Sequence, residues 1–161
     1  VQLRAYVEDI PLPAARPDLA AQAAAQFHAI DHLFRLLYRC DQTRRIAALD
    51  GDPRLRRLGA LLATAAEQQA RPDDPEATEA FLDRLRELMR DQRKRPRDRV
   101  IQAVVDGELS QDSGLERLDA LRWLHRVSYH LWRVRVHLNA LQSASTPPTR
   151  HEEARIDIAH D

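Results

Sequence analysis

Apolar residues recur at steps of three and four along most of this chain, and proline and glycine separate the periodic stretches. This spacing predicts amphipathic helices, because residues three and four positions apart lie on one face of an α-helix. Proline marks helix ends or kinks, since it lacks an amide hydrogen and its ring clashes with the preceding turn. The alternation that is typical of strands appears only as a weak trace at 4–10. The pattern predicts an all-α protein, an antiparallel bundle of four to five helices.

The prolines and glycines divide the chain into five predicted helices. Asp52 and Asp74 are predicted to cap the second and third, because each precedes a proline that suits the first helical position. The bundle is predicted to cover 19–142, between a poorly anchored segment at 1–18 and a flexible tail at 143–161. In chain order the helices run from Asp18 to about Leu49, from Pro53 to before Pro72, from Pro75 to a break at Pro96, through Val100–Val105 to a stop at Gly107, and from Asp112 or Ser113 to about Leu141.

Three of these helices have a long apolar stripe. We expect such stripes to form the core, and we expect Cys40, which lies on the first one, to be a small core residue. The stripes are Phe27, Ile30, Leu33, Phe34, Leu37 and Cys40 in the first helix, Phe81, Leu82, Leu85, Leu88 and Met89 in the third, and Leu115, Leu118, Leu121, Leu124, Val127, Leu131, Val134, Leu138 and Leu141 in the last.

Composition narrows the function classes. Lysine and arginine together number 25 and are matched by 25 acidic residues, so the chain lacks the basic surplus that nucleic-acid binding needs. One cysteine among 161 residues excludes a disulfide framework and a cysteine-based zinc site. No apolar run approaches the ~18 residues that span a bilayer. The chain starts at Val1 with no signal-peptide pattern, which suggests a domain of a longer protein.

Two segments of the predicted first and last helices resemble each other. Residues 29–38 align with 120–129, with Ala, Leu, Arg and Tyr identical at four of the ten positions. The shared arginine and tyrosine are less easily explained by a common helical core pattern than the leucine. We interpret the pair as a duplication, which predicts that Leu33 and Leu124 are both buried and that their helices pack against each other or against equivalent neighbours.

The repeated Leu-x-Arg-Val/Leu-x-Tyr segment, followed by His130 in the second copy, resembles the helix of PhoU-like domains that carries a Glu-Arg-Ile-x-Asp-His pattern. Residues 100–142 are most similar to the branch found in bacterial sodium/phosphate cotransporter-like proteins. The resemblance implies a regulatory or interaction domain linked to phosphate transport, on the cytoplasmic face of the inner membrane. Its implied partner is the membrane-embedded transporter portion of the parent protein.

The chain departs from that pattern at the positions of the metal-binding carboxylates. His125 and Tyr129 stand there in the second copy, and Phe34 and Tyr38 in the first. Phenylalanine and tyrosine are poor ligands for a hard metal cluster. We therefore expect no multinuclear metal cluster and no cofactor.

A second hypothesis is a metal-binding or metal-sensing bundle. His28, Asp31 and His32 share one helical face at i, i+3 and i+4, which suits a transition-metal site if the last helix supplies a further ligand. The competing interpretation is a solvated face on which Asp31 pairs with Arg35. The histidines of the last helix, His125, His130 and His137, are interpreted as interfacial residues or as pH-sensitive contacts.

The last helix also predicts an interaction face. Trp123, Trp132 and Val136 lie off its apolar seam, and arginines recur nearby at steps of four and seven. Such a patch is typical of an interface, so a homodimer is a further expectation. The alternative is that Val100–Val105 covers these groups and that the arginines pair with acids of neighbouring helices. The predicted face consists of Arg35, Arg122, Arg126, Tyr129, Trp132 and Arg133.

The chain contains one basic run and no recognisable catalytic motif. Six basic residues between Arg90 and Arg99 suit contact with an anionic membrane surface, although a solvated loop explains them as well. No serine has a glycine-flanked elbow, and no nucleophile–base pair can be recognised. We expect a non-catalytic protein.

Overall fold

The computed structural model describes residues 17–92 and 94–145, and within these ranges it is all-α. The predicted fold class, an antiparallel helical bundle, is confirmed. In chain order the helices are α2 (Pro17–Cys40), the single turn α3 (Thr43–Ala47), α4 (Pro53–Ala70), α5 (Pro75–Asp91), α6 (Lys94–Val105) and α7 (Gln111–Ser145). The expectations for 1–16 and 146–161 lie outside the described residues. Residues 143–145, which were assigned to the tail, are helical, because α7 continues through Ser145.

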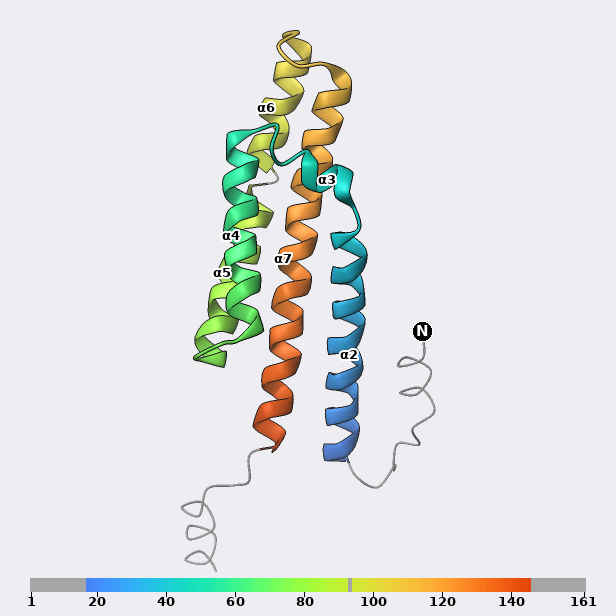
Figure 1. Cartoon of the computed structure of the whole chain (residues 1–161), viewed down its shortest axis with the longest axis vertical. Coiled ribbons are helices and arrows are strands. Elements are labelled where there is room, and N and C mark those ends of the chain that lie inside the picture. Colours follow the sequence, from blue (N-terminus) through green and yellow to red (C-terminus); the bar gives the residue numbers. More distant parts are fainter. Residues whose placement is uncertain (1–16, 93, 146–161) are drawn as a thin grey trace, which may run out of the picture.

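Helix α7 is the central helix of the bundle. Figure 1 shows it in the middle, with α4 and α5 together on one side and α2 on the other. Among the described helices, α2 packs along α7 and has no comparable contact with α4 or α5. The two long helices that carry the internal similarity therefore pack against each other, as predicted.

The helix starts follow the capping rules. An Asp52 carboxylate oxygen accepts from the backbone amides of Arg54 and Leu55 at 2.8 and 3.3 Å, and that of Asp74 likewise caps α5. Helix α7 starts slightly earlier than predicted, because Ser110 is its cap: its hydroxyl accepts from the amide of Ser113 at 3.2 Å. Each such cap contributes about 0.5–2 kcal/mol relative to alanine.

The first predicted helix is in fact two. Helix α2 ends at Cys40, and α3 begins after a short break at residues 41–42. The backbone carbonyl of Arg39 accepts a 3.0 Å hydrogen bond from the indole nitrogen of Trp123. In a continuous helix that carbonyl would accept from the amide of Thr43, which instead donates to Asp41. The predicted unbroken helix is therefore interrupted at the point where Trp123 of α7 contacts α2.

The hydrophobic core lies between α7 and the α4–α5 pair. It is aliphatic apart from Trp123, and Leu82 and Leu124 are almost completely inaccessible to solvent. The prediction that Leu124 is buried is confirmed. The core residues are Leu49, Leu55, Leu58, Leu62, Ala65, Leu82, Leu85, Met89, Ala120, Leu121, Trp123, Leu124, Val127 and Leu131.

The apolar stripe of α2 does not face this core, and its predicted burial is wrong. Leu33 is 45% exposed, and Leu37 and Cys40 are also exposed. Helix α2 instead turns Ala29, which is 4% exposed, toward the interior. The periodicity identified an apolar face correctly, but a periodic pattern does not say which neighbour covers that face. Smaller departures occur at Leu88 and Leu115, which are exposed although they were assigned to the core stripes.

Candidate interaction surface of α2 and α7

Four histidines lie at the contact between α2 and α7. His28 and His32 come from α2, and His130 and His137 come from α7. Their rings form a row in the order 28, 137, 32, 130, with centroid separations of 5.1, 5.8 and 5.2 Å. The Nδ1 atoms of His32 and His130 are 3.0 Å apart, so one of these rings donates a hydrogen bond and the other accepts it. We call these four side chains the histidine row.

Burial and nearby arginines favour the neutral form of the row. The pKa of His130 is lowered to about 4, first by burial and then by His32, Arg35 and Arg39. The pKa of His137 is also lowered to about 4, by burial and then by Arg133. Burial and Arg133 lower the pKa of His32 as well. These three rings are therefore neutral at pH 7, and they pair as polar groups within the interface.

The predicted ligand trio of α2 does not converge on one point. Asp31 accepts from the Arg35 guanidinium at 2.7 Å, which is the pairing expected of a solvated face. Among the described residues, no three His, Cys, Asp or Glu side chains are grouped as a metal site requires. The Arg133 Nε also lies 3.4 Å from His32 Nε2. His125 lies outside the row.

The opposite side of α2 is apolar and uncovered by the described helices. This side has two pairs of large apolar residues on adjacent turns, and 42–64% of each residue is exposed. The residues are Leu33, Phe34, Leu37 and Tyr38. We call these four residues the outer face of α2. Monomeric proteins rarely expose several large apolar side chains together, so a patch of this kind usually marks an interface.

The arginines of the predicted interaction face differ in their partners. Arg122 pairs with Asp119 on its own helix, and Arg35 pairs with Asp31. Arg133 contacts His32 and lies 5.6 Å from the centre of the Trp132 ring. Arg126 has no ion pair among the described residues. The expected pairing with acids of neighbouring helices is therefore not what these side chains do.

The two tryptophans do not form the exposed patch that the sequence predicted. Trp123 is 8% exposed, and its indole bonds to α2. Trp132 is half-buried on the other side of α7, where the Arg86 guanidinium lies 4.6 Å from the centre of its ring. Helices α2 and α5 cover these groups, rather than Val100–Val105.

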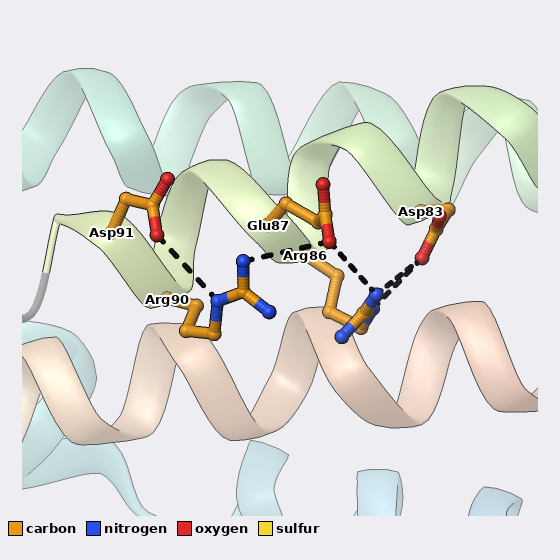
Figure 2. Close-up of polar contacts among 5 residues, drawn as sticks. All are labelled: Asp83, Arg86, Glu87, Arg90 and Asp91. Carbon is orange, nitrogen blue, oxygen red and sulfur yellow. Dashed lines mark hydrogen bonds and ion pairs between the residues drawn. The ribbon is translucent and has the colours of Figure 1, made fainter.

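A network of ion pairs on α5 holds Arg86 in this position. Figure 2 shows Arg86 between Asp83 and Glu87, at 2.6 and 3.5 Å, and Arg90 between Glu87 and Asp91 at 3.5 Å each. Arg90 belongs to the basic run that was considered for a membrane surface, and here it is paired with acids of its own helix.

A buried polar network on the core side of α7 was not predicted from the sequence. Arg135 is 3% exposed, and its Nε donates to Gln69 Oε1 at 3.1 Å. Asn139 continues the network and donates to Glu79 at 2.8 Å. A usable signal was the position of Arg135 one helical turn beyond Leu131, on a face that is otherwise apolar.

No protein-family model, curated protein or solved structure matches this chain. None of the described helices combines the length and the apolar character that crossing a membrane requires. The arrangement itself defines a helical bundle with one well-packed side and one helix whose apolar face is largely exposed among the described residues.

Proposed function

We propose that this protein is a non-catalytic interaction domain that binds a partner protein through the outer face of α2. The observation that supports the proposal is the exposure of four large apolar side chains on two adjacent turns, with Leu37 and Tyr38 61% and 64% exposed. Tyrosine is enriched at binding hot spots, and large apolar groups gain most from burial against a partner.

The partner that we propose is the membrane-embedded portion of a sodium/phosphate cotransporter-like protein, whose transport the domain regulates. This part of the proposal is based on the resemblance of residues 29–38 and 120–129 to PhoU-like helices.

Site-specific photo-cross-linking in native membranes tests this function. The photoreactive residue p-benzoylphenylalanine replaces Leu37 in the full-length gene product, and the matched control replaces Arg57, an exposed residue of α4. We expect cross-links from position 37 to a membrane-embedded segment and none from position 57. Equal cross-linking from both positions would contradict the interaction face. Cross-links from position 37 to a second copy alone would assign the face to a homodimer and overturn the transporter partner.

A second candidate function is metal sensing at the histidine row. The specific observation is that the structure brings His28 and His32 together with His130 and His137 of the last helix. Two imidazoles on one zinc ion have ring centres about 5 Å apart, because each Zn–N bond is about 2.0–2.1 Å. The observed separations are 5.1–5.8 Å, but two of the three ring pairs are stacked and no three of these side chains are grouped as a metal site among the described residues, so side-chain rotation is needed to bring three nitrogens to one point.

Equilibrium dialysis of zinc against tag-free protein tests the second candidate. Metal sensing requires about one zinc ion per chain, with binding lost in His32→Ala and kept in His125→Ala, which lies outside the row. An absence of binding by the unsubstituted protein would leave the interaction domain as the function.

A further inference from the structure

Two arginines at the contact between α2 and α7 have no acidic partner among the described residues. Arg39 Nε is buried and has no hydrogen-bond acceptor there, while its Nη1 makes only a long contact of 3.4 Å to Gln42. An unsatisfied buried donor usually costs about 1–3 kcal/mol, and more for a charged group. Arg126, on α7, takes part in no ion pair within the described ranges.

Arg39 and Arg126 belong to facing stretches of α2 and α7. The indole of Trp123 donates to the backbone carbonyl of Arg39. Arg126 lies three residues after Trp123 on α7, and its side chain is exposed. Burial lowers the pKa of Arg39, and the next largest causes are the charges of Arg126 and Arg45. A local excess of positive charge is therefore present at this point of the interface.

This excess does not reflect a shortage of acids. The protein has as many acidic as basic residues, and arginines elsewhere are paired, as Arg117 is with Asp52 at 3.2 Å. Next to the site, Arg35 and Arg122 each hold one carboxylate, that of Asp31 and that of Asp119. Those carboxylates balance the flanking arginines and leave the central pair uncompensated.

We propose that Arg39 and Arg126 form the centre of a binding site for a phosphate group at the contact between α2 and α7. Guanidinium groups bind phosphate in a bidentate manner, and a phosphate dianion offers enough charge and acceptor oxygens for two of them. Arg35 and Arg122 flank the centre. The group can come from inorganic phosphate or from a phosphomonoester lipid headgroup, since both present the same oxygens.

A hollow on the neighbouring surface has the opposite character. It has a volume of about 580 Å³ and lies beside α3 and the start of α7. Its lining includes two arginines and four acidic residues. The acidic residues are Asp41, Asp112, Glu116 and Asp119. Of these acids, Glu116 pairs with Arg44 and Asp119 pairs with Arg122.

Titration calorimetry of the 161-residue chain with inorganic phosphate tests the site, with sodium chloride at equal ionic strength as the reference. We expect a Kd of about 1 mM or tighter, weakened at least about tenfold by Arg126→Gln, which corresponds to about 1.4 kcal/mol. Arg39→Gln should act in the same direction. Arg57→Gln on α4 is the matched control and should bind phosphate as the unsubstituted chain does.

A vesicle arm distinguishes the two sources of phosphate. Phosphatidylcholine vesicles with and without phosphatidic acid are sedimented with the protein. Binding that needs phosphatidic acid and is lost in Arg126→Gln, without binding of free phosphate, assigns the site to a lipid headgroup. No binding in either arm, or equal binding by Arg126→Gln, would overturn the proposal. Arg126 is exposed, so its substitution does not depend on tolerance of a core change.

Discussion

The two sides of α7 are packed by different chemistry. On one side, leucines of α4 and α5 close over Leu121, Leu124 and Val127 in an aliphatic core. On the other side, α2 contacts α7 through Ala29, Leu36 and the histidine row, while Leu33 and Leu37 are exposed. Burial of apolar area stabilises a fold by roughly 25 cal/mol per Å², whereas hydrogen-bonded polar contacts add little net free energy.

The difference indicates that α4, α5 and α7 form the stable unit and that α2 is the more weakly held helix. A helix that is held by polar groups and apolar on its outside is suited to binding, because a partner can cover the outer face without disrupting the core.

The two leucines of the internal similarity should respond very differently to truncation. Leu124→Ala removes a side chain that is 1% exposed, and we expect a loss of about 2–5 kcal/mol in the free energy of unfolding. Leu33→Ala, at the matching position of α2, should change it by less than about 0.5 kcal/mol, as surface substitutions do. Urea denaturation followed by circular dichroism measures both. Equal losses would remove the distinction between the two sides of α7.

Acid should loosen α2 before it affects the core. The folded-state pKa values of His32, His130 and His137 are lowered below the ordinary 6.5, so the unfolded state binds more protons below that pH. Their contribution to stability is complete above about pH 6.5 and is lost as the pH falls toward 4. The charged groups that face the row are Arg35, Arg39 and Asp31 of α2 and Arg133 of α7.

Hydrogen exchange at pH 7.5 and 5, corrected for the intrinsic rates, measures this effect helix by helix. We expect amides of α2 to lose protection at pH 5 while those of α4 and α5 keep it. His130→Gln should reduce the pH dependence, whereas His125→Gln should leave it unchanged. Uniform loss of protection in all helices would show that the row does not control α2 separately.

The contact of Arg86 with Trp132, on the core side of α7, should contribute a smaller amount to the free energy of unfolding. Arg86→Ala removes the guanidinium over the indole, and we expect a loss of about 0.5–2 kcal/mol. Arg90→Ala, in the same ion-pair network but half exposed, should cost less than about 1 kcal/mol. Denaturation with tryptophan fluorescence compares the variants. Equal effects would mean that the ion pairs, rather than the ring contact, stabilise this side.

Metal analysis provides the weakest expected signal. Because Phe34, Tyr38, His125 and Tyr129 replace carboxylates of the PhoU-like pattern, we expect no multinuclear iron or zinc cluster in tag-free protein. Elemental analysis measures metal per chain. Two or more iron or zinc ions per chain would contradict the expectation and would make the α2 side of the bundle the more rigid one.

Local rules accounted for much of the fold. The aspartates before Pro53 and Pro75 and the left-handed Gly107, with φ of 74°, set helix ends where the sequence predicted them. The candidate site was less predictable. The sequence placed Arg35, Arg126 and Tyr129 on a possible face, but the pairing of His32 with His130 joins residues 98 positions apart.

The sequence by itself determined that the chain is helical, which faces of the helices are apolar and where most helices begin, because these features depend on residues within a few positions of one another. Only the tertiary structure decided that α2 turns its alanine and histidine side to α7, that the indole of Trp123 bonds to Arg39 next to the end of α2, and that the Nε of Arg39 is buried without an acceptor among the described residues. The reason is that α7 offers two sides, and the aliphatic residues of α4 and α5 occupy the one on which apolar burial is greatest. The apolar stripe of α2 therefore faces outward. This outcome depends on contacts between segments that are distant in the sequence, and a local pattern does not predict such contacts.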